Sequence, residues 1–252
     1  MNLAYTSLVY SHDFYRMKET RYGAVLYDVN EGVGQAFQEY GEYEELKLQT
    51  ILQHTYPGDY IVDIGSHLGY VTLPLSYKVG NSGKVISFEF RSHLFQLLSA
   101  NLALNNINNV NAYQKILSDQ NSFLFEQDNL TPSLQSLLDT KKVSYPVDVL
   151  RLDSLELPYC HLININYPCE KSIIDVLKGS TRTLQQFKPT LFIEVFIKSD
   201  EIIKELRRWL SHLGYRVKLV NYSCYNRSNF YNSPYNIFRL ETKSYYLAEY
   251  HQ

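Results

Sequence analysis

Short apolar runs alternate with helical periodicity from residue 58 onward. Three of these runs are YIVDIG at 60–65, KVISFEF at 84–90 and VNAYQKIL at 110–117. Between the last two, the segment SHLFQLLSANLALNN carries leucines at helical spacing. Strands that alternate with amphipathic helices predict a mostly parallel sheet with helices on both faces.

The second half of the chain repeats this alternation. Strands are predicted in HLININY, PTLFIEVFI and YRVKLV, and helices in EKSIIDVLKGSTRTLQQF and DEIIKELRRWLSHL. Gly214 directly follows the last helical stretch, where a glycine commonly ends a helix. A final strand near residues 236–240 would complete a sheet of about seven strands. The expected fold class is therefore α/β.

Residues 1–57 show a different pattern. They combine the strand-like pieces AYTSLVY and RYGAVLYDV with one helical stretch, GEYEELKLQTILQH. No fixed-period repeat, low-complexity tract or Pro/Gly/Ser-rich linker separates them from the rest of the sequence. We therefore expect an N-terminal cap over residues 1–57 and one main domain over residues 58–252.

Composition and charge exclude several classes of protein. The 252 residues are 45% hydrophobic and 20% charged, which is typical of a globular protein. The 24 Lys and Arg residues against 26 Asp and Glu residues leave a formal charge of −2, without blocks of like charge. We therefore expect no nucleic-acid partner and no membrane partner.

Targeting segments and metal motifs are not apparent either. The longest strand-like apolar run is interrupted by Glu194, and no run approaches the roughly 18 residues of a membrane span. The first residues lack a basic start and a long apolar stretch, so a cytoplasmic location is expected. The three cysteines form no C-x-x-C pair and the histidines lack metal-ligand spacing, so no metal site is predicted.

Candidate chemistry lies after the first two strands of the predicted sheet. In an open α/β sheet, ligands bind at the carboxyl ends of the strands, and the loop after the first strand commonly holds a cofactor. That loop runs from Asp63 to Gly69, and its glycines permit a tight turn close to a ligand. Glu89 ends the second strand, where a carboxylate suits the two hydroxyls of a ribose. The pattern favours an adenosine-type ligand over a solvated strand end.

These motifs resemble a known family. The run PGDYIVDIGSHLGYVTLPLSYKVGNSGKVISFEF resembles the S-adenosylmethionine-binding half of FkbM-type methyltransferases. The segments YEELKLQTIL, LLSANLALNNINNV, VLRLDSL, DVLKGS and KPTLFIEV all occur in the order that the family shows. Most class I methyltransferases share the glycine loop, whereas this series is specific to the family. The resemblance implies a Rossmann-like class I methyltransferase fold with S-adenosylmethionine as cofactor.

The resemblance also implies roles in the glycine loop. Asp63, Gly65 and Gly69 would line the methionine end of the cofactor. Ser66 and His67 stand where the family usually has Ala-Asn. His67 can still donate or accept a hydrogen bond toward the cofactor carboxylate or amine.

Three further residues would hold the adenosine end, by the same resemblance. Glu89 would bind the ribose, and Ser118 and Asp119 would approach the adenine. A departure follows later in the chain, where the family segment I-K-I-D-V-E-G reads INYPCEK. Pro168 then replaces an Asp and Lys171 a Gly, which removes a carboxylate close to the expected reaction centre.

Methyl transfer aligns a nucleophile with the methyl group and removes the proton of the nucleophile. Two carboxylates are candidate catalytic groups. Glu170 survives from the acidic pair of the family, although an acid at a helix N-terminus is also explained by the helix dipole. Glu194 lies inside an apolar strand, where a carboxylate needs a partner or a task.

By resemblance, the expected reaction is O-methylation of a hydroxyl on a glycan or a small natural product. The tyrosine-rich segment 222–250 could stack on such an acceptor, but composition favours half-buried strand residues. An alternative is a catalytically silent binding or scaffold subunit with the same fold, suggested by the change at Pro168. A nicotinamide-dependent oxidoreductase is disfavoured because the third glycine of G-x-G-x-x-G is missing.

Overall fold

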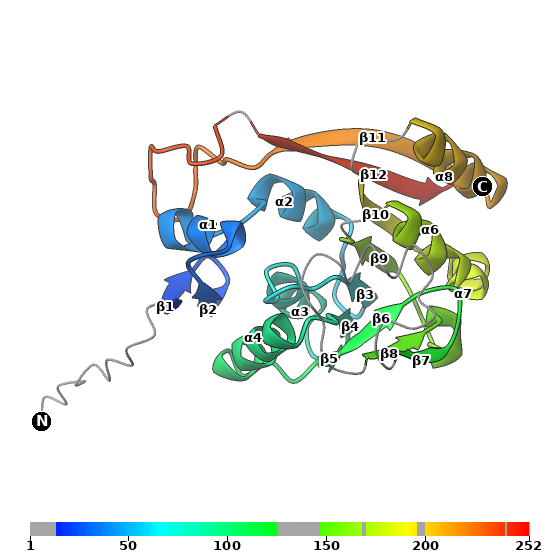
Figure 1. The fold of residues 1–252 in the computed structure, drawn as a ribbon, viewed down its shortest axis with the longest axis horizontal. Coiled ribbons are helices and arrows are strands. Elements are labelled where there is room, and N and C mark those ends of the chain that lie inside the picture. Colours follow the sequence, from blue (N-terminus) through cyan, green and yellow to red (C-terminus); the bar gives the residue numbers. More distant parts are fainter. Residues whose placement is uncertain (1–13, 125–146, 168–169, 196–199, 240, 252) are drawn as a thin grey trace, which may run out of the picture.

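A computed structural model describes residues 14–124, 147–167, 170–195, 200–239 and 241–251. Its central sheet has seven strands in the order β11–β12–β10–β9–β3–β4–β5 (Figure 1). These are β3 (Tyr60–Ile64), β4 (Lys84–Phe88), β5 (Val110–Tyr113), β9 (Leu162–Ile165), β10 (Thr190–Val195), β11 (Tyr215–Ser223) and β12 (Thr242–Tyr250). Neighbours among β3, β4, β5, β9 and β10 pair in parallel, whereas β12 is antiparallel to β10 and β11. The predicted α/β class and mostly parallel seven-stranded sheet are confirmed.

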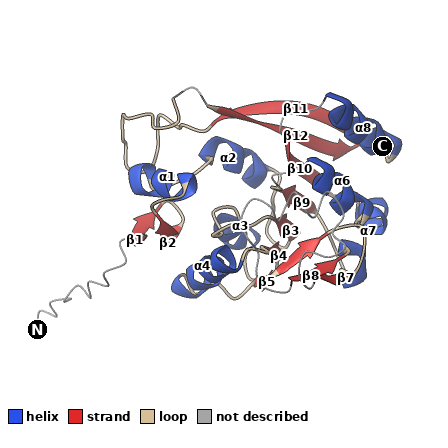
Figure 2. Cartoon of the chain, viewed as in Figure 1, coloured by secondary structure: helices blue, strands red, loops and turns tan. Residues whose placement is uncertain are grey.

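Helices cover both faces of this sheet (Figure 2). They are α3 (Thr72–Val79), α4 (Ser92–Leu104), α6 (Glu170–Lys178), α7 (Thr181–Phe187) and α8 (Asp200–His212). Successive strand residues point to opposite faces. Ile61 of β3 therefore packs in the hydrophobic core that includes α3 and α4, while its neighbour Val62 packs in the core that includes α6, α7 and α8. Both side chains are fully buried, which stabilises the fold by about 1.5–3 kcal/mol each.

The N-terminal part is built from a hairpin and two helices. The hairpin is β1 (Tyr15–Thr20) with β2 (Gly23–Asp28), and the helices are α1 (Gly32–Tyr40) and α2 (Glu45–Gln53). Asn101 of α4 ties this part to the sheet, since it accepts a hydrogen bond from Leu26 N (2.7 Å) and donates one to Leu68 O (2.9 Å). The division into a cap over residues 1–57 and a domain over 58–252 stays a prediction.

The connection between β11 and β12 reaches back to this N-terminal part. Figure 1 shows it passing from the end of β11 down to α1. Tyr40 donates a hydrogen bond to Tyr235 O (2.8 Å), and Arg21 donates one to Ser228 O (3.0 Å). The last quarter of the chain and the first quarter therefore pack together beside the carboxyl edge of the sheet.

A small second sheet extends beyond β5. It contains β6 (Lys115–Leu117), β8 (Val147–Leu150) and β7 (Ser122–Leu124), in that order. A 3-10 helix, η1 (Leu152–Leu155), follows β8. The single strand predicted over VNAYQKIL is therefore wrong in extent, because the chain divides into β5 and β6, which belong to different sheets.

Two further sequence predictions need correction. The last strand does not lie near residues 236–240, because Asn236 accepts a hydrogen bond from Phe238 N (3.1 Å) in a turn, and the strand begins at Thr242. The single helix predicted over residues 170–187 is broken between α6 and α7. At Gly179 a Cβ would lie 1.9 Å from Ser118 O, so the backbone at Gly179 lies too close to the backbone of Ser118 to leave room for a side chain.

In the described part of the chain, no helix combines the length and the apolar character needed to cross a membrane.

Candidate functional site

The glycine loop links the end of β3 to α3. Gly65 and Gly69 have φ angles of 78° and 98°, which side chains rarely adopt. A Cβ on Gly65 would lie 2.4 Å from Asn166 O, and one on Gly69 would lie 2.7 Å from Leu73 Cδ1. Both positions therefore need glycine to pack against Asn166 and Leu73, and the close approach of the loop to a ligand stays a prediction.

Gly65→Ala should destabilise the fold by about 1–3 kcal/mol, because the new Cβ meets a backbone oxygen and the residue keeps a left-handed conformation. Chemical denaturation followed by circular dichroism measures the change. Gly32→Ala is the matched control, since a Cβ there has no heavy atom within 4 Å. Equal stability of the two variants would contradict the account of the loop.

Asp63 lies beneath this loop and not on its surface. Its carboxylate is fully buried and accepts hydrogen bonds from Thr72 Oγ1 (2.6 Å) and Asn164 Nδ2 (2.8 Å). Burial raises the pKa of Asp63, although these hydrogen bonds oppose the effect. Asp63 thus joins β3 to α3 and β9 and holds the loop in shape, while a direct contact with the cofactor stays a prediction.

Ser66 and His67 connect the loop to its surroundings. Ser66 Oγ donates to Asp63 O (2.9 Å). The His67 backbone N–H donates to Glu89 Oε2 (2.9 Å). The ring Nε2 of His67 lies 3.2 Å from Glu31 Oε2. Its Nδ1 is buried without a hydrogen-bond partner in the described part of the chain. His67 therefore offers one unused polar atom in the loop.

Glu89 follows β4 directly and is fully buried. Its Oε1 accepts hydrogen bonds from Arg91 N and Arg91 Nε (both 2.9 Å). Its Oε2 accepts from His67 N (2.9 Å) and Arg91 Nη2 (3.0 Å). Burial alone would raise the pKa of Glu89, but the Arg91 guanidinium and these donors lower it overall. Glu89 is therefore ionised at neutral pH, and Arg91 donates three of the four hydrogen bonds that its oxygens accept, two of them from the guanidinium.

Ser118 and Asp119 follow β6, in the small sheet. Ser118 is buried and its Oγ donates to Asp119 Oδ1 (3.3 Å). Tyr167 connects this segment to the Glu89 side, since its hydroxyl accepts from Leu117 N (3.1 Å) and its ring contacts Phe90 edge to face. The structure thus brings this segment toward the adenosine end, and contact with an adenine stays a prediction.

Asn166 was not among the residues chosen from the sequence. It directly follows β9, and its Nδ2 donates to the Tyr70 hydroxyl (2.5 Å). Its Oδ1 is buried and has no hydrogen-bond partner among the described residues. The sequence feature that could have identified Asn166 is its position at the carboxyl end of a buried strand. Pro168 lies outside the described residues, and Glu170 begins α6 with a side chain that is outside them as well.

Glu194 belongs to a buried group of four charged residues, which we refer to as the charge cluster: Glu44, Lys47, Glu194 and Lys243. Lys47 Nζ lies 2.5 Å from Glu44 Oε2, and Lys243 Nζ lies 2.7 Å from Glu44 Oε1. Lys243 Nζ also lies 2.9 Å from Glu194 Oε1. Glu194 therefore has the partner that its place in an apolar strand requires.

Aromatic contacts join the charge cluster to the glycine loop. Lys47 Nζ lies 5.2 Å from the centre of the Tyr70 ring, and Tyr70 directly follows Gly69. The Tyr43 and Tyr70 rings meet edge to face at 5.0 Å. The cluster could have been noticed from the sequence, because Glu44 and Lys47 fall at helical spacing with the apolar Leu48. The sequence does not show that Glu44 and Lys47 join Glu194 and Lys243 in one cluster.

The charge cluster predicts a specific dependence of stability on pH. Burial would raise the pKa of Glu44, but the two ammonium groups lower it from the ordinary 4.5 to about 2. Its contribution to stability is therefore complete above pH 4.5 and is lost as the pH falls toward 2. Glu44→Gln should be less stable than the wild type at neutral pH, and the difference should narrow on acidification.

Denaturant titrations at several pH values measure this difference. Glu241→Gln is the control, because Glu241 is exposed and its variant should follow the wild type at every pH. A constant difference between Glu44→Gln and the wild type over the acid range would contradict the prediction.

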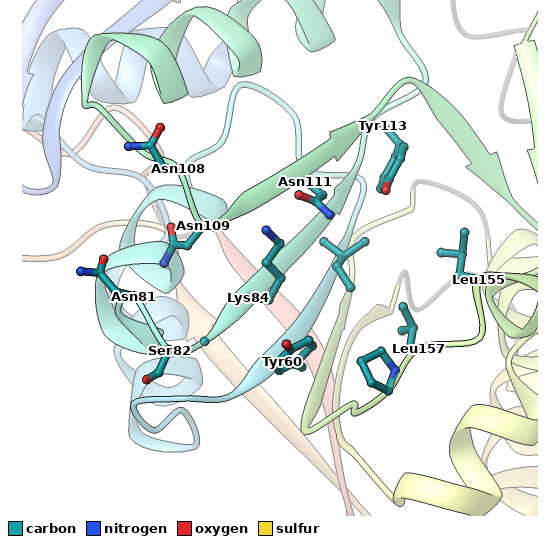
Figure 3. A pocket seen from close by; sticks show the side chains of 13 residues that line it. Tyr60, Asn81, Ser82, Lys84, Asn108, Asn109, Asn111, Tyr113, Leu155 and Leu157 are labelled. Carbon is teal, nitrogen blue, oxygen red and sulfur yellow. The ribbon is translucent and has the colours of Figure 1, made fainter.

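A separate cavity lies at the other end of the sheet (Figure 3). It has a volume of about 480 Å³ and is lined by Tyr60 and Lys84, the first residues of β3 and β4, and by several asparagines. Because the glycine loop and Glu89 follow the last residues of the same strands, this cavity is not the cofactor site. No group of metal-ligating side chains occurs among the described residues.

The residues at the carboxyl edge fit S-adenosylmethionine. Asn166 Oδ1 and His67 Nδ1 are buried polar atoms without hydrogen-bond partners among the described residues. The strand order reverses between β3 and β9, which is where open α/β sheets bind their ligands. Glu89 and the glycine loop would hold the ribose and the methionine end, respectively.

Comparison with known proteins agrees with this site. The model of the methyltransferase FkbM domain matches residues 63–217, more than half of the chain. Among curated protein sequences, none matches.

Solved structures show the same fold. A putative rRNA-methylase from Clostridium thermocellum has 12% identity and a TM-score of 0.52, covering 84% of this chain and 97% of that one. TYW2 from M. jannaschii in complex with AdoMet also has 12% identity and a TM-score of 0.52, covering 96% and 87%. An rRNA methylase from Streptococcus thermophilus has 11% identity and a TM-score of 0.50, covering 82% and 95%.

At these identities the structural likeness establishes the fold, which is the Rossmann-like one expected from the sequence. The family is established by the domain match, which covers the residues after β3, the acidic end of β4 and the strands up to β11. The chain therefore belongs to the FkbM methyltransferases, and S-adenosylmethionine is its cofactor.

Proposed function

We propose that the protein methylates a hydroxyl group of a glycan or a small natural product. The observation that carries this proposal is the state of Glu194. Its Oε1 lies 2.9 Å from Lys243 Nζ, and no second hydrogen bond or ion pair of this carboxylate is found among the described residues. A hydroxyl must lose its proton on methylation, whereas a neutral amine attacks through its lone pair. A buried carboxylate with one available oxygen therefore favours O-methylation.

The strand order supports the location of this base. Glu89, at the end of β4, marks the ribose side of the site, and β9 and β10 lie on the other side of β3. The methionine end would thus extend toward the strands that carry Asn166 and Glu194. Glu194 is the fifth residue of the six in β10, so it lies at the same carboxyl edge as the glycine loop.

When bound, S-adenosylmethionine supplies the methyl group, so that an O–C bond forms while the C–S bond breaks and leaves its electron pair on sulfur. Glu194 takes up the hydroxyl proton at Oε2. Burial raises the pKa of Glu194 above its ordinary value, while Lys243 opposes this rise. The carboxylate is therefore a stronger base than an exposed one.

The surroundings of the charge cluster favour a neutral, ring-shaped acceptor. Its two carboxylates and two ammonium groups balance in charge. Tyr43 contacts both Tyr70 and Phe238, and Phe238 contacts Tyr40, which forms a row of rings from the loop before β12 to the glycine loop. Sugar and aromatic rings stack on such faces.

A catalytically silent scaffold is the second candidate, and one observation favours it. The Arg91 guanidinium fills two of the four acceptor positions on Glu89 and backbone N–H groups fill the other two, so a ribose must displace the guanidinium. A scaffold has no turnover, so it does not need this ion pair to open in every reaction cycle.

Two measurements test the proposal. Calorimetric titration with S-adenosylmethionine and its demethylated product should give binding of both. Transfer of a tritiated methyl group to hydroxylated sugars, lipids and secondary metabolites, with mass spectrometry of the product, should give an O-methylated compound. RNA is included as an acceptor, because its methylation would overturn both the glycan or natural-product proposal and the expected lack of a nucleic-acid partner. Cofactor binding without transfer to any acceptor would favour the scaffold.

A further inference from the structure

We infer that Lys243 is a positioning residue for methyl transfer, whose ammonium holds Oε1 of Glu194, keeps that carboxylate ionised and leaves Oε2 for the acceptor hydroxyl. This inference rests on the proposed function. Lys243 lies in the last strand of the chain, outside residues 63–217 matched by the family model.

The sheet topology places Lys243 at the reaction edge. It is the second residue of β12, which runs antiparallel to β10, so the beginning of β12 lies beside the end of β10. Glu194 pairs with Tyr245 in the sheet register, and Lys243 is two residues away on the same face of β12. Lys243 Nζ therefore lies beside Glu194 at the carboxyl ends of the parallel strands.

The other groups around Glu194 cannot replace this ammonium. Lys47 Nζ lies 2.5 Å from Glu44 Oε2, and no direct contact between Lys47 and Glu194 is found among the described residues. The Glu44 carboxylate is a like charge that disfavours ionisation of Glu194. The titratable groups that act on Glu194 from the neighbouring elements are Lys243, Glu44, Lys47, Tyr70, Tyr245 and Cys224. Without Lys243, a buried carboxylate beside another carboxylate would take up a proton.

Exposure separates Lys243 from the rest of the charge cluster. Its side chain is 24% exposed, against 4% for Glu194 and none for Lys47. Its ammonium also lies 5.5 Å from the centre of the Tyr43 ring, within the row of aromatic rings. Lys243 is thus the member that lies between the buried base and the open side of the molecule, where an acceptor arrives.

The two lysines provide a matched pair of variants. Lys47→Met removes an ammonium that contacts Glu44 and acts on Glu194 only from a greater distance, so it should reduce stability and shift the titration of Glu194 less than Lys243→Met does. Lys243→Met should shift the titration of Glu194 upward by about 1–3 pH units, as expected for the loss of an adjacent opposite charge. Lys243→Arg restores a positive charge and should restore most of the wild-type value. Lys218→Met, at an exposed position on β11, is the neutral control.

The titration is measured by NMR of protein labelled with ¹³C at the glutamate carboxyl carbons, with and without the demethylated cofactor, and Glu194→Gln assigns the signal. This readout does not depend on an acceptor, so it stands even if no hydroxyl is methylated and the proposed function fails. With an active acceptor, the acid limb of the pH dependence of kcat should move upward in Lys243→Met and return in Lys243→Arg. An unshifted Glu194 signal in folded Lys243→Met would overturn the inference, as would equal shifts in Lys47→Met and Lys243→Met.

Discussion

Glu194→Gln is expected to lower the kcat of methyl transfer by about 10²–10⁴-fold, the usual contribution of a positioned general base. The amide has nearly the same shape as the carboxylate but cannot take up the acceptor proton. Lys243 keeps its contact with Glu44 at 2.7 Å, so the fold should persist. The dissociation constant of S-adenosylmethionine should stay unchanged, because the effect is confined to the transition state.

Single-turnover transfer and calorimetric titration on the same preparation separate these two quantities. Glu205→Gln serves as the control, since Glu205 is exposed on α8 and should retain full activity. If Glu194→Gln transfers methyl groups as fast as the wild type, Glu194 is not the base. Positioning of the acceptor alone would then have to support the reaction.

Glu89→Ala is expected to weaken the binding of S-adenosylmethionine by about 1.5–3 kcal/mol, or roughly 10- to 150-fold. The loss corresponds to hydrogen bonds between a charged acceptor and the ribose hydroxyls. Unlike Glu194→Gln, this variant should change the dissociation constant before it changes the chemical step. Titration calorimetry at a pH near 7 measures the difference.

The ion pair with Arg91 has to be separated from this effect. In Glu89→Ala the Arg91 guanidinium loses both of its side-chain contacts with the carboxylate. The double variant Glu89→Ala/Arg91→Ala removes the unpaired cation as well, so it should bind the cofactor as weakly as the single variant. Wild-type affinity in the double variant would show that Glu89 does not hold the ribose and that the loss came from Arg91.

Much of the central sheet was predictable because its strands are buried on both faces. A strand between two layers of helices needs apolar residues at nearly every position, and the runs at 60–65, 84–90 and 189–197 show this without a partner. β12 escaped prediction because polar residues stand among its tyrosines, so its sequence TKSYYLAEY lacks the apolar run. The apolar residues Ile237 and Phe238 led instead to the prediction of a strand at 236–240. In the structure they contact Tyr40 of the N-terminal part.

The helix over residues 170–187 failed for another reason. Its apolar residues keep helical spacing on both sides of Gly179, and the break at this glycine accommodates the approach of Ser118, which is 61 residues away in the chain. Local propensity contains no information about such a contact.

The sequence alone determined the parts of the site whose chemistry is local. Gly65, Gly69 and Glu89 were recognisable because a tight turn after a buried strand and an acid at the end of the next strand follow from backbone sterics and charge within 30 residues. Only the tertiary structure decided which charges meet. The charge cluster joins residues 44 and 47 to 194 and 243 because β12 inserts beside β10. Ionic partners are set by distance in the folded chain, and no pattern of neighbouring residues encodes that distance.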